Sequence, residues 1–197
     1  MTAILTENFN SYTDWDIVWQ GSWTSQQFWT NYDIQWTVVQ EWAKWLALLA
    51  GTLWWTPIIY KIWTAVADWT QAFYVRKTVT NEEFLVLLEQ HSTLTWAIVK
   101  FSTGGQIQYF NGSAYVDIQA YSADTWYLIE VEWRTSDNTA RYRIDWWSWT
   151  SFVAVNWTFT SIDSIRFIWQ ATTSWDVYID NFYDPSVTTN SNFLAFF

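Results

Sequence analysis

Residues 125–133 read Thr-Trp-Tyr-Leu-Ile-Glu-Val-Glu-Trp, and after the polar loop 136–139 the chain continues at 140–145 as Ala-Arg-Tyr-Arg-Ile-Asp. Apolar and polar side chains alternate from Ile129 to the end of the first run and along the whole second run, which is typical of half-buried β-strands. The two runs therefore predict an antiparallel hairpin. Its apolar face holds Tyr127, Ile129, Val131 and Trp133 of the first strand and Tyr142 and Ile144 of the second. Its other face is a charge ladder of Glu130, Glu132, Arg141 and Arg143, in which we expect Glu132 to face Arg143.

A second hairpin is predicted by residues 106–110 and 113–118. They flank Asn111-Gly112, a dipeptide typical of a two-residue type I′ turn. That turn would pair Phe110 with Ser113 and would put Ile107 opposite Val116. One apolar set would then share one face of the hairpin.

Tryptophan is the unusual feature of the composition, because twenty tryptophans stand beside five glycines. Trp15, Trp69, Trp146 and Trp157 each follow Asp or Asn, where glycine would complete a common turn and tryptophan would be strained. We therefore hypothesise that UGA codons meant as glycine are written as tryptophan at sixteen positions. Strand-like or aromatic surroundings favour genuine tryptophan at the other four, Trp23, Trp126, Trp133 and Trp149.

Short β-rich runs separated by turn residues continue along the chain without a long helical period. The run 41–50 resembles an amphipathic helix as written, but glycine at 42 and 45 would make 46–50 a strand. We expect an all-β fold, a two-sheet antiparallel β-sandwich of the jelly-roll type, with a single domain over 1–184 and a C-terminal tail over 185–197. Further strands are expected near 83–89, 96–101, 149–154, 162–168 and 176–183.

Charge and composition exclude several kinds of partner. Nineteen acidic and nine basic residues give a net charge of -10, which repels nucleic acid and anionic lipid. No run of apolar residues is long enough to insert into a membrane, and no export signal is recognisable at the start. The absence of cysteine excludes disulfides and thiolate metal sites. The apolar end of the tail is expected to pack on the domain or on a neighbouring subunit, as in a homo-oligomer.

The runs 8–12, 125–133, 140–145 and 176–182 resemble those of concanavalin A-like lectin/glucanase (laminin-G-like) jelly-roll domains. The resemblance spans about residues 6–184. It implies that the first and last strands pair, and that Tyr-Ile-Asp-Asn at 178–181 belongs to the last strand. Members of the family include carbohydrate-binding modules, adhesive domains, virion proteins and glycosidases, so the fold does not select one function.

Sugar recognition by β-sandwiches commonly combines aromatic rings with Asp, Asn and Gln, because sugar C–H faces stack on rings while the hydroxyls need polar partners. One part of the chain carries this combination and is our candidate ligand-binding site: Tyr115, Asp117, Gln119, Tyr121, Asp124 and Trp126.

Two further kinds of site are weaker candidates. Structural calcium could gather oxygen ligands from Glu7, Asp16 and Asp180, although a hard cation needs six to eight oxygens. The run Glu130-Val-Glu132 approximates the Glu-x-Asp-x-x-Glu run of glycosidases of this fold, but it lacks the central Asp and the third carboxylate. We expect a structural role for it. His91, the single histidine, is expected in a loop or on the surface.

The sequence therefore predicts a non-catalytic carbohydrate-binding or adhesive module with a glycan or polysaccharide as partner, on a virion or a cell surface. One alternative is a structural or decoration protein of a phage virion or cell surface. A glycoside hydrolase or polysaccharide lyase is the third possibility.

Overall fold

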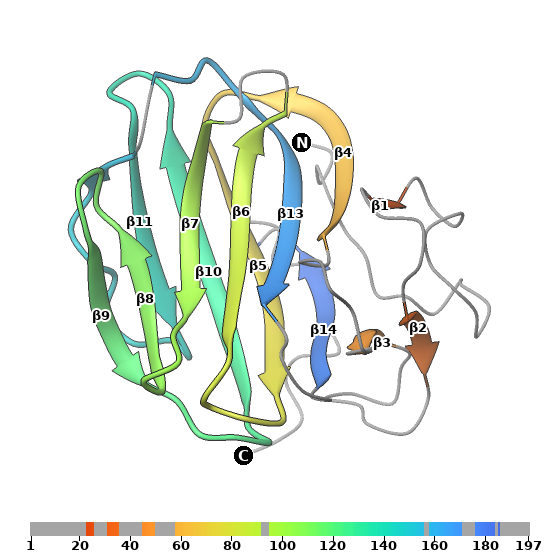
Figure 1. Ribbon diagram of the computed structural model, residues 1–197. Coiled ribbons are helices and arrows are strands. Elements are labelled where there is room, and N and C mark those ends of the chain that lie inside the picture. Colours follow the sequence, from red (N-terminus) through yellow and green to blue (C-terminus); the bar gives the residue numbers. More distant parts are fainter. Residues whose placement is uncertain are drawn as a thin grey trace.

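The computed structural model describes residues 23–25, 31–35, 45–49, 58–91, 95–155, 158–170, 176–183 and 185. Every regular element in these residues is a β-strand, and all the strands pair antiparallel in two seven-stranded sheets that lie face to face (Figure 1). This confirms the predicted all-β fold, a two-sheet antiparallel β-sandwich of the jelly-roll type. The described residues contain no helix that is long and apolar enough to cross a membrane.

Each sheet combines strands from distant parts of the chain. The first sheet has, in spatial order, β1 (Trp23–Ser25), β4 (Ile58–Val66), β13 (Ile162–Gln170), β6 (Glu83–Gln90), β7 (Thr95–Phe101), β8 (Gln106–Phe110) and β9 (Tyr115–Ala120). The second has β12 (Val153–Ala154), β11 (Thr139–Ile144), β10 (Trp126–Arg134), β5 (Trp69–Lys77), β14 (Asp176–Tyr183), β3 (Trp45–Leu49) and β2 (Asn31–Gln35).

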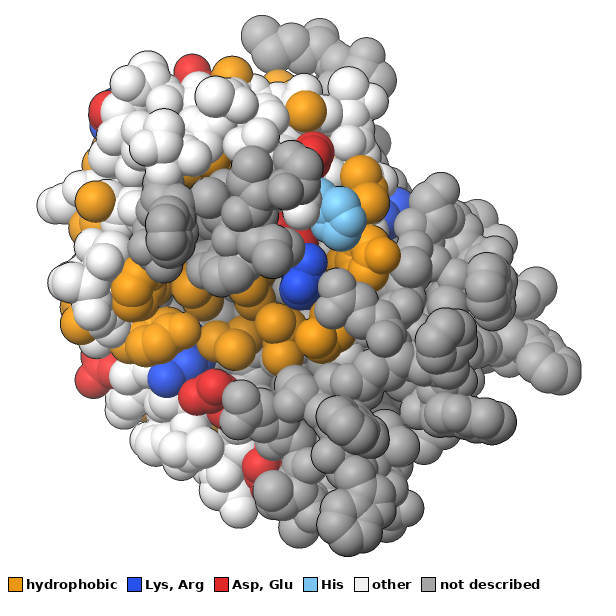
Figure 2. All heavy atoms as spheres, turned by 45° about the horizontal axis from the view of Figure 1, so that its top comes forward, with side chains coloured by type: hydrophobic (Ala, Val, Ile, Leu, Met, Phe, Trp, Pro, Cys, Tyr) orange, Lys and Arg blue, Asp and Glu red, His pale blue; other side chains and the backbone are white. Residues whose placement is uncertain are grey.

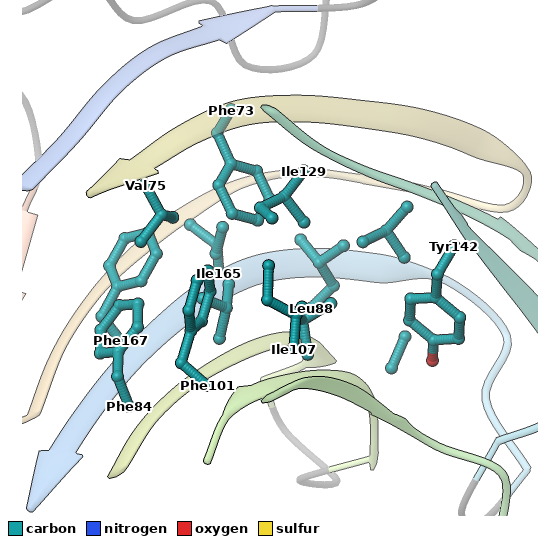
Figure 3. Close-up of a cluster of buried hydrophobic side chains, with 14 of the residues drawn as sticks. Phe73, Val75, Phe84, Leu88, Phe101, Ile107, Ile129, Tyr142, Ile165 and Phe167 are labelled. Atoms are coloured by element: carbon teal, nitrogen blue, oxygen red, sulfur yellow. The ribbon is translucent and has the colours of Figure 1, made fainter. Parts of the chain in front are cut away.

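The core lies between the two sheets and is rich in phenylalanine (Figure 3). Phe84 and Phe167 of the first sheet stack with their ring centroids 6.1 Å apart. Across the interface, the Phe73 ring of β5 meets the Phe167 ring edge-on at 6.4 Å. Each such ring removed from water contributes roughly 1.5–3 kcal/mol to folding. The alternation predicted for β10 and β11 is confirmed, because the six residues assigned to the apolar face are all buried in this core.

The register of the charge ladder differs from our prediction. Arg134 pairs with Thr139 at the end of the hairpin, so Glu132 lies opposite Arg141 and Glu130 lies opposite Arg143. The expected pairing of Glu132 with Arg143 is wrong by one step of the ladder. Both faces of the hairpin nevertheless hold the predicted residues, because a shift of two residues keeps every side chain on its own face.

The 106–120 hairpin has a longer loop than the two-residue turn that we predicted. The side-chain oxygen of Asn111 accepts hydrogen bonds from the backbone N–H groups of Ser113 and Ala114, at 3.0 and 2.9 Å. The first strand pair is therefore Phe110 with Tyr115, and Val116 lies opposite Tyr109 instead of Ile107. The Asn111 side chain closes a four-residue loop that the Asn-Gly dipeptide alone does not indicate.

Most of the other predicted strands are present. The run 46–50 contributes to β3, as the glycine argument favoured, whereas only Val153 and Ala154 of 149–154 form a strand. The run 178–181 lies in β14, as the resemblance implied. The resemblance also implied that the first and last strands pair. Among the described strands, the last, β14, pairs with β3 and β5, and the first, β1, pairs with β4. Residues 8–12 and the tail, apart from Pro185, lie outside the described residues.

The described tryptophans divide between turns and strands. Trp146 has φ +63°, is 56% exposed and follows Asp145 at φ +49°. The Trp147 N–H donates to the Ile144 carbonyl oxygen at 3.0 Å. This hydrogen bond closes a type I′ turn whose two central residues are Asp145 and Trp146. Other tryptophans assigned to glycine lie at regular strand positions: Trp45, Trp63, Trp69, Trp96 and Trp169. Trp133, assigned as genuine, is fully buried.

Candidate functional site

One row of side chains crosses six strands on the outer face of the first sheet. Arg166 of β13 lies opposite Tyr60 of β4 and Leu87 of β6, and Leu87 lies opposite Ile98 of β7. The pairing of Val99 with Tyr109 sets Phe110 of β8 beside Ile98, and Phe110 pairs with Tyr115 of β9. Their chain neighbours point into the core, so this row faces outward. Figure 2 shows hydrophobic side chains gathered along this face, with the histidine at one end.

The two ends of this row are its accessible parts. Tyr115 is 38% exposed at one end, whereas Leu87 and Ile98 in the middle are only 5% and 7% exposed. Tyr60 is half-buried at the other end. The row therefore offers solvent two separate places where a ligand could contact it.

The end at β9, which we call the Tyr115 platform, consists of Tyr115, Phe110, Lys100, Gln108 and Asp117. The Phe110 ring meets the Tyr115 ring at 5.4 Å in a T-shaped contact, and the Lys100 ammonium lies 3.9 Å from the Tyr115 ring centroid. The Gln108 side-chain amide donates to Asp117 Oδ1 at 2.7 Å. The platform thus sets an aromatic ring beside an amide–carboxylate pair that has further hydrogen-bonding capacity.

The surroundings of Tyr115 disfavour ionisation of its hydroxyl. Burial, and then the negative charge of Glu83, raises the pKa of Tyr115, so its hydroxyl remains a hydrogen-bond donor at neutral pH. The Lys100 ammonium lies 3.2 Å from the Glu83 carboxylate. Its charge is therefore largely compensated within the protein.

The end at β4, which we call the His91 cluster, consists of His91, Tyr60, Glu89, Arg166 and Ser164. The His91 and Tyr60 rings stack with their centroids 5.1 Å apart. Arg166 Nε and Nη2 lie 3.0 and 2.8 Å from Glu89 Oε1. Glu89 is fully buried, and burial raises the pKa of its carboxyl while Arg166 opposes that shift. His91 occupies the turn after β6, and its side chain is 33% exposed.

Ser164, His91 and Glu89 are the residue types of a hydrolase triad, but their geometry is not that of a triad. A triad needs the histidine between the serine and the carboxylate. Here Ser164 Oγ and His91 Nδ1 both approach Glu89 Oε1, at 3.3 and 3.6 Å. Ser164 is also fully buried, so it is not placed to attack a substrate.

The structure separates the six residues predicted to bind ligand. Tyr115 and Asp117 lie together on the Tyr115 platform, whereas Gln119 reaches the Asp145 side chain with a hydrogen bond. Tyr121 is only 6% exposed and packs edge-on against the Phe101 ring at 5.1 Å. Its ring therefore presents no face to an external ligand.

Trp126 begins β10 of the second sheet, and Asp124 lies in the turn just before it. Arg76 donates to Asp124 Oδ1 at 2.5 Å, and Trp126 pairs with Arg76 across β10 and β5. The Trp126 ring packs against a small buried cluster on the outer face of that sheet, formed by Ala72, Tyr74 and Leu128.

The carboxylates compared with the glycosidase run are both paired with arginine. Arg143 forms two hydrogen bonds to Glu130, at 2.5 and 2.6 Å, and Arg141 forms two to Glu132 Oε2, at 2.9 and 2.6 Å. Both carboxylates are therefore engaged by arginines of the neighbouring strand. The geometry supports a structural role for the ladder.

Of the three residues proposed to bind calcium, the structure describes only Asp180. Asp180 is fully buried in β14, and its Oδ1 accepts the Asn181 backbone N–H at 2.7 Å. No group of three or more acidic, histidine or cysteine residues that could hold a metal occurs in the described part of the chain. Glu7 and Asp16, the other proposed ligands, lie outside that part.

Sequence reasoning missed most of the face that the structure brings together. Tyr60, Glu89 and Arg166 come from three strands that are far apart in the chain, and no local motif links them. His91 was expected in a loop or on the surface, and it is indeed a half-exposed turn residue, but its neighbours could not be predicted. Alternation alone could have placed Tyr60 and Arg166 on outer faces.

Comparisons with known proteins bear on the fold. No protein-family model and no curated protein matches the sequence. Among solved structures, a sialidase superposes with a TM-score of 0.75 at 14% identity, over 92% of this chain and 18% of the sialidase chain. A Bacillus licheniformis β-glucanase gives 0.63 at 11% identity, over 93% of this chain and 98% of that chain. The catalytic domain of a glycoside hydrolase family 131 protein from Coprinopsis cinerea gives 0.61 at 16% identity, over 92% and 93%. At these identities the similarity establishes the fold alone.

Proposed function

We propose that this protein is a non-catalytic module that binds carbohydrate through the Tyr115 platform. The observation that carries the proposal is the exposed Tyr115 ring beside the Gln108–Asp117 pair, whose side chains are joined at 2.7 Å. A sugar ring can lay its C–H face on an aromatic ring while its hydroxyls bond to an adjacent amide and carboxylate. The folds of the sialidase and the two glycoside-hydrolase structures are compatible with such a role.

The charges on this face favour a neutral glycan over an acidic one. The net charge is -10, and Asp117 adds an exposed carboxylate at the platform. The cations of the platform and the His91 cluster, Lys100 and Arg166, are each close to a carboxylate already. A uronic or sialic acid would therefore meet repulsion without an uncompensated cation to offset it.

Binding to a panel of neutral and acidic polysaccharides tests the proposal. We expect retardation in gels that contain a neutral β-glucan, mannan or galactan, and none with polygalacturonate or hyaluronan. Tyr115→Ala should weaken binding about tenfold, since an aromatic contact contributes about 1.4 kcal/mol. Tyr115→Phe retains the ring and should bind nearly as the parent does. Phe152→Ala removes an aromatic ring just before β12, outside the platform, and is the matched control.

Two results would contradict the proposal. Equal binding by Tyr115→Ala and the parent would exclude the platform. Failure to bind any polysaccharide, together with stable oligomers in light scattering, would favour the alternative of a structural or decoration protein.

Glycoside hydrolysis is the competing function, because two of the structural relatives are named as glycoside-cleaving proteins. The two ladder glutamates are engaged by arginines, and Glu89, whose pKa is raised, is fully buried. Release of reducing sugar from the same panel would reveal hydrolysis. If turnover were found and Glu132→Gln abolished it, the non-catalytic assignment would be wrong.

A further inference from the structure

We infer that the His91 cluster is a second contact point for the same glycan, so that the ligand is a chain long enough to reach it from the Tyr115 platform. The inference rests on the proposed function, because it assumes that the platform binds sugar. It adds a second site and a minimum ligand length.

The distance between the two ends follows from the sheet. Tyr60 and Tyr115 stand in the same row, on β4 and β9, with β13, β6, β7 and β8 between them. Five strand spacings of about 4.8 Å place the two ends about 24 Å apart. A monosaccharide or disaccharide can therefore contact one end only, whereas a longer oligosaccharide has the length to contact both.

The His91 cluster has the chemistry of a sugar contact. His91 Nδ1 is buried, so the exposed third of the side chain belongs to its other atoms. An imidazole edge can donate to or accept from a sugar hydroxyl, and the adjoining Tyr60 ring adds apolar surface. The cluster thus repeats, at the far end of the row, the aromatic-plus-polar combination of the platform.

The buried ion pair below these rings makes the cluster rigid. Arg166 extends from its contact with Glu89 to the Tyr60 ring, with its guanidinium carbon 5.7 Å from the ring centroid. Asp163 Oδ1 accepts the His91 backbone N–H at 2.7 Å. Because the rings are held before a ligand arrives, binding there costs little side-chain entropy.

Two linked contacts predict a dependence on chain length. Once the platform holds one end of a chain, the second contact is intramolecular and raises the affinity without any change at the first. We expect oligosaccharides that reach both ends to bind at least tenfold more tightly than fragments that reach one. His91→Ala should remove this gain and leave the affinity for short fragments unchanged.

Calorimetric titration with cello-, laminari- and manno-oligosaccharides, from disaccharide to octasaccharide, tests the inference. The expected result is that, in at least one series, affinity increases sharply once the oligosaccharide reaches a certain length. His91→Ala should abolish this increase. The control Thr64→Ala, at an exposed position on β4, should preserve it. An affinity that is independent of length, or a step that survives in His91→Ala, would overturn the second contact while leaving the platform intact. Absence of binding by every series would refute the platform itself and the inference with it.

The single histidine supplies an independent readout. Its imidazole NMR signals need no assignment by mutagenesis. Octasaccharides should shift them, while disaccharides that bind at the platform should not. Unshifted His91 signals in the saturated octasaccharide complex would overturn the inference even if affinity increased with length.

Discussion

The ammonium nitrogen of Lys77 lies 2.9 Å from the hydroxyl oxygen of Tyr121 in the interior of the sandwich. The carbonyl oxygens of Thr80 and Ser102 lie 3.2 and 3.1 Å from the same hydroxyl. Because a tyrosine has one hydroxyl hydrogen, Tyr121 donates to a carbonyl oxygen and accepts from Lys77. Lys77 also donates to the Glu82 carbonyl oxygen. Tyr121 is one of the residues that we predicted to bind ligand. In the structure its hydroxyl oxygen accepts a hydrogen bond from the buried Lys77.

This burial should make the protein more stable as the pH rises above 7. Burial lowers the pKa of Lys77 to about 7, although the carboxylates of Glu82 and Glu83 oppose the shift. In the unfolded chain a lysine has a pKa of about 10.4, so above pH 7 the unfolded state binds more protons. The free energy of unfolding therefore increases with pH, by up to about 1.4 kcal/mol per pH unit, until the unfolded lysine also titrates.

Urea unfolding at several pH values between 7 and 9.5 measures this slope. The upper limit avoids the tyrosines, whose raised pKa values would lower the stability above about pH 10. Lys77→Met preserves the length of the side chain without its charge and should give a flat profile. The same positive slope in Lys77→Met would show that another group is responsible.

The two rungs of the charge ladder should differ in their importance for stability. Glu130 is fully buried beneath Arg143, whereas Glu132 is partly exposed beside Arg141. Glu130→Gln would leave Arg143 without its buried carboxylate, and we expect a loss of about 3 kcal/mol. Glu132→Gln should cost less than about 1 kcal/mol, because solvent screens that pair. Denaturant midpoints of the two variants make the comparison, and equal losses would contradict it.

The two ladder rungs also show what the sequence can predict. Alternation along 129–134 identified both faces of β10 correctly, because one face of the strand must be buried. The partner of each glutamate depended on where the loop closes, and that was wrong by one step. The same limit applied at Asn111, where side-chain hydrogen bonds lengthened the loop.

The candidate site was harder to predict than the fold because it depends on pairing between distant strands. Tyr115 and Asp117 share a face by alternation, and the sequence grouped them correctly. Tyr121 and Trp126 were grouped with them because they are close in the chain, but the chain crosses from the first sheet to the second between 120 and 126. Tyr60 joins Tyr115 only through five strand pairings, none of which is encoded locally.

Trp146 offers the sharpest test of the hypothesis that glycines are written as tryptophan. Its φ of +63° costs a residue with a Cβ atom about 1–2 kcal/mol, a penalty that glycine does not incur. Trp146→Gly should therefore be more stable than Trp146→Ala by about that amount, since both variants lose the ring that lies 5.3 Å from Arg143. Comparing the two variants isolates the backbone strain from the loss of the ring.

Trp147 is the matched control for this comparison. It is 72% exposed and its φ is not positive, so alanine there should be as stable as glycine, or more stable by up to about 1 kcal/mol. Urea unfolding of the four variants gives both differences. Glycine favoured over alanine at 146 but not at 147 would show that the Asp145-Trp146 turn requires glycine. No preference at 146 would remove the structural support for the hypothesis, and UGG codons at 146 and 147 in the gene would exclude it there.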